Sequence, residues 1–205
     1  MKPNFQIQFL LLTPLIFLFT INTAYSQETE FKNSSIRTGI GIGLNQGKRE
    51  DGVGLVYSIG WQKSFGEKSK FRLNPNMSIG GFSPVIITGL RDQFYRITLL
   101  GINIHYDLIR YKAISLVTTG GGFMNYSRGL LGTGGRPANR WSEYFNTAYF
   151  GGTGSVGFRF NPAKSNLAFE VRPINIHLGN KEFLLGYIMG GIDFKLRNSK
   201  RSTNL

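Results

Sequence analysis

Alternation of apolar with small or polar residues from Val53 to Gly80 constrains the fold of this chain most strongly. Every second residue from Val53 to Trp61 is apolar, and the same pattern returns from Phe71 to Ile79. A period of two predicts β-strands, and the polar segment between the arms predicts a hairpin in which Trp61 faces Phe71. The opposite face carries mainly glycine, serine, asparagine and arginine. Such a partition is typical of a barrel wall with hydrocarbon outside and a polar interior.

The first residues predict a secretory signal peptide. Lys2 supplies a positive start, residues 9–20 (FLLLTPLIFLFT) form an apolar core, and residues 24–26 (Ala-Tyr-Ser) offer a cleavage site before Gln27. A membrane-spanning helix is disfavoured, because the apolar run is shorter than the ~20 residues that a bilayer requires and contains Pro14. We therefore expect a mature chain that has left the cytoplasm.

The remaining sequence predicts an all-β fold: an eight-stranded antiparallel up-and-down transmembrane β-barrel after a cleaved signal peptide. Closure is expected because lipid offers no partner to an open strand edge. The expected strands are 35–45, 53–62, 71–80, 94–106, 113–126, 147–160, 167–178 and 183–196. The expected domains are a signal peptide (1–26), a periplasmic N-terminal segment (27–34), an outer-membrane β-barrel (35–197) and a basic periplasmic tail (198–205).

The connections between these strands predict the orientation of the barrel. Three alternate connections are short (63–69, 107–112 and 161–166), whereas the others vary and include the long segment 127–146. Outer-membrane barrels have short periplasmic turns and longer extracellular loops. The segment 127–146 is therefore expected to be an extracellular contact loop, with Arg128, Arg136, Arg140 and Trp141 as candidate contact residues.

Aromatic residues are expected at both membrane interfaces, where ring and head group meet. Those near the periplasmic ends of the strands are Trp61, Phe71, Tyr106, Phe158, Phe160 and Phe194. Those near the outer ends are Phe82, Phe94, Tyr95, Tyr126, Tyr149, Phe150 and Phe183.

Charged residues within the strands fall on the row opposite to the large apolar side chains. An arginine that faces lipid at mid-bilayer costs ~2–4 kcal/mol, so these residues are expected to point into the barrel. We predict an ionic network in the periplasmic half of the lumen, formed by Arg37, Arg72, Arg159, Glu170, Arg172, Asp193 and Lys195. Arg96 is an exception near a strand end, where the cost falls toward ~0–1 kcal/mol.

Two prolines interrupt the strand pattern. Pro75 and Pro173 lie within expected strands, and a closed barrel has no free edge to accommodate them. Each is expected to mark a bulge, and a register shift is expected after Pro173 because Ile174 and Ile176 reverse the alternation.

Composition argues against several classes of function. The chain has no cysteine and only two histidines, so no metal and no other cofactor is expected. The formal net charge is +13, but the charges are spread over strand ends and loops and form no basic helix. The expected partners are therefore outer-membrane lipid and lipopolysaccharide, and no nucleic acid.

Barrel size limits the function further. Eight strands enclose an interior just wide enough for side chains to fill, so a porin role is not expected. The prediction is a small non-enzymatic barrel with a structural, adhesive or accessory role through its extracellular loops, where a protein partner could bind. One alternative is a lipid-modifying enzyme that uses His177 with Glu182 and Ser142. Another is a soluble secreted β-sandwich or lipocalin-like binding protein.

Three stretches carry a resemblance to a known family. They are the Ala-Tyr-Ser signal ending, the Gly39-x-Gly41-x-Gly43 first strand and the closing segment 190–196 (Gly-Gly-Ile-Asp-Phe-Lys-Leu). In these features, and in its glycine- and aromatic-rich strands, the chain resembles the outer-membrane β-barrel domain proteins of Bacteroidota, including PorT-like and OmpX-like small barrels. The resemblance covers about the whole mature chain and implies an outer-membrane location. Members include secretion-linked and adhesion-type barrels, so the resemblance does not choose a role.

Overall fold

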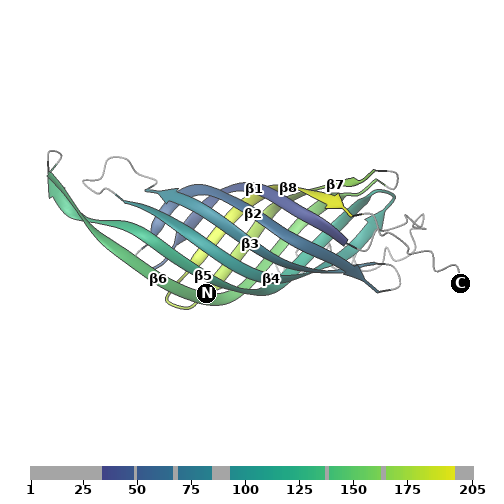
Figure 1. Ribbon diagram of the computed structural model, residues 1–205, viewed down its shortest axis with the longest axis horizontal. Helices are drawn as coiled ribbons and strands as arrows, with labels where there is room; N and C mark the ends of the chain where they lie inside the picture. Colours follow the sequence, from purple (N-terminus) through teal and green to yellow (C-terminus); the bar gives the residue numbers. More distant parts are fainter. Residues whose placement is uncertain are drawn as a thin grey trace, which may run out of the picture.

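The computed structural model of this protein describes residues 34–48, 50–66, 69–84, 93–136, 139–162 and 165–196, and these residues form eight strands. The strands are β1 (Ser34–Gln46), β2 (Asp51–Phe65), β3 (Phe71–Ser83), β4 (Phe94–Tyr111), β5 (Ile114–Arg136), β6 (Asn139–Phe160), β7 (Leu167–Gly179) and β8 (Leu184–Lys195). Each strand pairs antiparallel with the next, and β1 also pairs with β8, so the sheet closes (Figure 1). The predicted eight-stranded up-and-down barrel is confirmed.

Other predictions concern residues beyond this range. The signal peptide (1–26) and the basic tail (198–205) lie outside the described residues, as does nearly all of the N-terminal segment 27–34. Within the residues that the structure describes, no helix is long and apolar enough to cross a membrane.

The two ends of the barrel differ, and we name them by their connections. The "turn rim" holds the turns after β2, β4 and β6, together with the ends of β1 and β8 at Ser34 and Lys195. The "hairpin rim" holds the connections after β1, β3, β5 and β7.

Successive residues along each strand separate into an apolar outside and an inward row. On β1, Ile40 and Ile42 are exposed, whereas Arg37 and Gly41 are buried. This follows from the strand period of two. Glycine is required at Gly43, because a Cβ there would collide with the backbone of β8.

The β2–β3 hairpin has the predicted faces in a different register. Phe71 pairs with Phe65 rather than with Trp61, so the expected pairing is wrong. The turn is tighter than the sequence pattern suggested, because Gly66 adopts φ 86° and its carbonyl accepts a hydrogen bond from the N–H of Ser69. The strand partner of Phe71 thus changes from Trp61 to Phe65. Because the register differs by an even number of residues, every side chain keeps its predicted face.

Asparagine side chains accommodate both strand prolines. Pro75 lacks an N–H for the carbonyl of Trp61, and the amide of Asn74 donates to that oxygen at 3.0 Å instead. The strand keeps its register at Pro75, so the bulge expected there is absent. At Pro173 the register shifts on both sides of β7, as predicted, and the amide of Asn175 donates to two backbone carbonyls beside the bulge.

Much of the predicted loop 127–146 is instead a paired extension of β5 and β6. The two strands stay paired up to Arg136 and Asn139, whereas β4 pairs with β5 only as far as Leu130. They therefore run beyond the barrel as a two-stranded ribbon, seen at the left of Figure 1. We call residues 131–148 the hairpin extension; its base, residues 144–148, lies opposite the β5 residues that still pair with β4.

Glycine composition explains why this segment was predicted as a loop. Residues 132–135 read Gly-Thr-Gly-Gly, which has no side-chain alternation. The structure uses one of these glycines at a register shift, where Gly134 adopts φ 143°. Pairing with β6 makes the segment a strand, and that pairing is not visible in local composition.

Candidate functional site

An ionic cluster fills the half of the lumen next to the turn rim. Glu170 on β7 lies at its centre, with Oε1 2.9 Å from Arg37 Nη2 and 2.6 Å from Arg172 Nε. Its Oε2 lies 3.0 Å from Arg37 Nη1 and 3.8 Å from Arg72 Nη1. All four side chains are buried. One carboxylate thus neutralises part of the charge of three guanidinium groups.

Two aspartates complete the ionic cluster. Asp107 on β4 pairs with Arg72 at 2.5 Å and with Arg110 at 2.6 Å. Asp193 on β8 pairs with Arg159 at 2.8 Å. Within the described residues, five arginines meet three carboxylates in this cluster, so its formal charge is positive.

Strands β2 and β5 contribute neutral side chains to the same layer. Gln62 on β2 approaches Asp193 at 3.5 Å, and Thr119 on β5 hydrogen-bonds His105 Nδ1 at 2.7 Å. All eight strands therefore contribute a polar side chain. Such a layer cross-links the wall of the barrel and blocks its lumen.

Six residues named for the lumen network from sequence lie in this cluster: Arg37, Arg72, Arg159, Glu170, Arg172 and Asp193. The seventh, Lys195, lies apart: its ammonium donates to the carbonyls of Pro162 and Ser165 at the β6–β7 turn.

Sequence reasoning missed Asp107 and Arg110 because it assigned both to a turn. β4 continues to Tyr111, so both lie in a strand. A signal was present, because Asn103 and His105 occupy the inward row and Asp107 is the next residue of that row.

Large apolar side chains fill much of the lumen next to the hairpin rim, where the pattern suggested a polar interior, and they lie beside buried polar groups such as Asn125 and His177. Four aromatic residues expected at the outer interface are buried here, so their predicted outward position is wrong, whereas Phe94, Tyr126 and Phe150 face outward. The buried cluster consists of Val56, Phe82, Tyr95, Ile97, Leu99, Phe123, Phe145, Tyr149, Phe183, Leu185 and Met189.

Inward glycines explain this aromatic layer. The rings of Phe82 and Tyr95 stack with centroids 5.5 Å apart, a geometry worth about 0.5–1.5 kcal/mol beyond area burial. A Cβ at Gly54 or Gly80 would collide with the ring of Phe82. The rings thus occupy space that neighbouring glycines leave empty, and the lumen is filled at this end too.

A buried carboxyl group, Glu50, lies at the hairpin rim between β1 and β2. It is 2% exposed and accepts a hydrogen bond from the amide of Asn45 at 2.8 Å. Burial raises the pKa of Glu50 above its ordinary value of 4.5, while hydrogen bonds from Asn45, Ser127 and Tyr149 oppose the shift.

Stability is expected to fall as pH rises through the raised pKa of Glu50. The folded protein retains the Glu50 proton at pH values where the unfolded chain, with a pKa near 4.5, has released it. This contribution is complete below pH 4.5 and lost above the raised pKa. In urea unfolding across that range, the free energy of unfolding of the Glu50→Gln variant should decline less than that of the native protein. Asp51→Asn, at an exposed carboxylate, is the control. Equal pH dependence in the native protein and Glu50→Gln would contradict this assignment.

Six aromatic residues surround the barrel near the turn rim. Trp61, Phe71, Phe158, Phe160 and Phe194 are exposed on the outside, and Tyr106 is partly exposed. Phe71 contacts Tyr106 with ring centroids 4.7 Å apart. Exposed rings at the end of an apolar belt are typical of a membrane interface.

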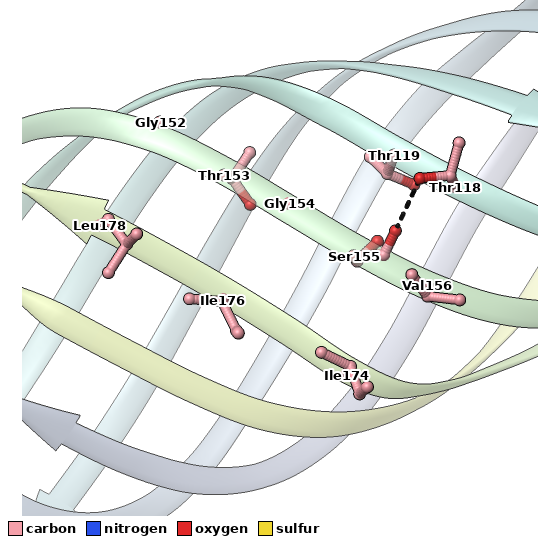
Figure 2. A pocket seen from close by; sticks show the side chains of 10 residues that line it. All are labelled: Thr118, Thr119, Gly152, Thr153, Gly154, Ser155, Val156, Ile174, Ile176 and Leu178. Carbon is pink, nitrogen blue, oxygen red and sulfur yellow. Dashed lines mark hydrogen bonds between the residues drawn. The ribbon is translucent and has the colours of Figure 1, made fainter. Parts of the chain in front are cut away.

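A recess of about 530 Å³ lies on the outer surface of β5, β6 and β7. Figure 2 shows Ile174, Ile176 and Leu178 along β7, beside Gly152 and Gly154 of β6, whose missing side chains deepen the recess. Thr118 donates a hydrogen bond to the backbone carbonyl of Ser155 at 3.5 Å, so its hydroxyl is satisfied within the wall. None of the lining residues ionises. The recess therefore suits hydrocarbon rather than a polar substrate.

The residues of the enzymatic alternative are not assembled into a site. His177 is buried in the lumen, with Nε2 3.1 Å from the Tyr187 hydroxyl and 3.4 Å from Thr153 Oγ1. Ser142 is an exposed residue of the hairpin extension, and Glu182 is exposed at the β7–β8 turn. Among the described residues, no group of three or more His, Cys, Asp or Glu side chains is placed to hold a metal ion.

The candidate contact residues lie on or beside the hairpin extension. Trp141 is 67% exposed, and Tyr144 on the same strand is 58% exposed. Arg128 is exposed on β5. Arg136 ends β5, and Arg140 is the second residue of β6.

Two solved structures share this fold. Neisserial surface protein A aligns with a TM-score of 0.56 and 11% identity over 80% of this chain and 97% of its own. Ail, the attachment invasion locus protein of Yersinia pestis, aligns with a TM-score of 0.50 and 12% identity over 80% of this chain and 99% of its own. No protein-family model matches the sequence, and no curated protein matches it.

The closed barrel, its apolar outer belt and its ionic interior together define a transmembrane β-barrel of the outer-membrane type. The exposed belt includes Ile40, Leu55, Ile102 and Val171 from four different strands, and such a surface requires a bilayer. The protein is therefore located in the outer membrane.

Proposed function

We propose that the protein is a non-enzymatic outer-membrane barrel that acts through protein contacts on its hairpin extension, with the hairpin rim outside the cell. The exposed Trp141 and Tyr144 carry this proposal: Trp141 lies on the ribbon beyond the barrel wall, and Tyr144 lies at the base of that ribbon, opposite Leu130. Tryptophan and tyrosine are enriched among the residues that dominate binding energy in protein interfaces.

Other observations support the same role. Ionic and aromatic layers fill the lumen, so passage of solutes is not its function. One protein with the same fold is named a surface protein and the other an attachment invasion locus protein, and a contact role at the cell surface agrees with both names. From the sequence resemblance we propose in addition that the chain belongs with the small outer-membrane barrels of Bacteroidota, some of them adhesion-type.

Attachment of cells that display the barrel tests the proposal. Cells of a laboratory bacterium carrying the native protein are applied to host-cell monolayers, to plates coated with matrix protein and to a layer of cells carrying the same barrel. Trp141→Ala combined with Tyr144→Ala is expected to reduce attachment to the surface that binds the native protein by about tenfold or more.

Ser142→Ala combined with Glu143→Ala is the matched control, because it changes the two exposed residues between the aromatic pair. Surface amounts of each variant are equalised by antibody staining. Native cells that attach no better than cells without the barrel on all three surfaces would contradict the proposed role. Full attachment by the variant lacking both aromatic side chains would show that the hairpin extension is not the contact surface.

A further inference from the structure

Two arginines face each other on the outside of the barrel near the hairpin rim. Arg96 on β4 and Arg128 on β5 are direct cross-strand partners, and both are exposed. Like charges in directly opposite positions destabilise a sheet. Within the described part of the chain, neither arginine forms an ion pair with an acidic side chain, and Arg96 lies 6.0 Å from the centre of the Phe94 ring. An anion from outside the protein would remove this repulsion.

The neighbours of the arginine pair leave it accessible. On one side Gly81 of β3 pairs with Arg96, and a Cβ added there would contact only the Phe94 ring, at 3.9 Å. On the other side Asn146 of β6 pairs with Arg128 and is exposed. The row therefore presents two guanidinium groups between an open stretch of backbone and an amide that can donate a hydrogen bond.

The rows above and below the arginine pair are apolar or aromatic, and they indicate the depth of the pair in the membrane. Toward the hairpin rim, Phe94, Leu130 and Tyr144 form one outward row. Toward mid-barrel, Tyr126 and then Leu100 and Met124 continue the apolar belt. Aromatic residues beside an apolar belt mark the level of lipid head groups.

We propose that Arg96 and Arg128 form a binding site for the phosphate group of a lipid in the leaflet at the hairpin rim. A guanidinium group matches phosphate oxygens through paired N–H donors, and two of them facing one another surround a single anion. The acyl chains of the same lipid would lie along the outward row that contains Leu100 and Met124. This inference rests on the proposed orientation, with the hairpin rim outside, and it specifies which lipid group the barrel binds.

Lipid binding by the intact barrel in phosphatidylcholine nanodiscs tests the site. The nanodiscs contain increasing amounts of lipid A, and bound lipid is counted by native mass spectrometry. Each arginine near an anionic lipid is worth about 1 kcal/mol, so Arg96→Gln combined with Arg128→Gln is expected to weaken lipid A binding by about thirtyfold. Lys63→Gln combined with Lys112→Gln is the matched control, since it removes two exposed charges from the turn-rim side of the barrel.

Three further arms identify the group that is bound. Lipid A without its phosphates is expected to bind the native barrel about as weakly as lipid A binds the double arginine variant. Arg96→Lys combined with Arg128→Lys should recover only part of the affinity, because lysine keeps the charge and loses the fork of donors. Inorganic phosphate added to the buffer should not displace the lipid, because the site faces the bilayer.

Equal lipid A binding by native and Arg→Gln barrels would overturn the site, as would equal binding of lipid A with and without phosphate. Displacement by inorganic phosphate would overturn the lipid as its ligand. These failures differ from failure of the proposed function. A barrel that enters nanodiscs and does not bind lipid phosphate lacks the lipid site but keeps its hairpin extension. A chain that stays in solution is not a membrane barrel. A gel on which unheated and heated samples migrate differently verifies that each variant is folded.

Discussion

Replacing Glu170 by alanine is expected to lower the free energy of unfolding by ~3–5 kcal/mol, because it leaves buried arginines without their shared carboxylate. Glu170 contacts Arg37 and Arg172 directly, at 2.9 and 2.6 Å, and all three side chains are buried. The cluster is already formally positive, so the remaining carboxylates cannot compensate. Mutual repulsion of the arginines would add to the cost of burying them.

Urea titrations of the barrel in lipid vesicles, followed by tryptophan fluorescence, measure this effect. The chain carries two tryptophans, Trp61 and Trp141. Glu143→Ala, at an exposed carboxylate on the hairpin extension, serves as control and should change stability by less than ~0.5 kcal/mol. Adding Arg172→Ala to Glu170→Ala should cost less than the two single changes summed, because the pair is coupled. A loss below about 1 kcal/mol for Glu170→Ala would mean that the ionic cluster does not hold the barrel together.

Replacing Ile102 by arginine is expected to destabilise the barrel by ~2–4 kcal/mol, because this side chain faces hydrocarbon. Ile102 lies near the middle of β4, is 61% exposed on the outside and pairs with Gly122 and Pro75. In a water-soluble barrel the same substitution at so exposed a position would change stability by less than ~0.5 kcal/mol. The experiment therefore separates a membrane barrel from the lipocalin-like alternative.

Leu130→Arg provides the matched comparison near the hairpin rim. It introduces the same side chain at a residue that is 45% exposed and pairs with Phe94. Its expected cost is only ~0–1 kcal/mol, since an arginine at the interface reaches water. Equal effects of the two substitutions, measured by urea titration in vesicles, would mean that the outer surface does not lie across a bilayer.

Sequence alone determined the strand count, the closure of the sheet and, apart from the four buried aromatic residues, the two faces of the wall. Strand parity is a local property, because side chains alternate however the strands pair. The even shift between the predicted and observed partners of Phe71 therefore left Arg72 inside and Leu73 outside. The register shift at Pro173 was also predictable, because Ile174 and Ile176 interrupt the local alternation.

Only the tertiary structure decided what fills the barrel and how far its strands extend. Arg37 and Glu170 are 133 residues apart in sequence and meet only because closure brings their strands to one lumen. The ring of Phe82 fits inside the barrel because Gly54 of the neighbouring strand leaves space for it, and the hairpin extension depends on pairing between β5 and β6. These features arise from contacts between strands, whereas alternation along one strand reports only which way each side chain points.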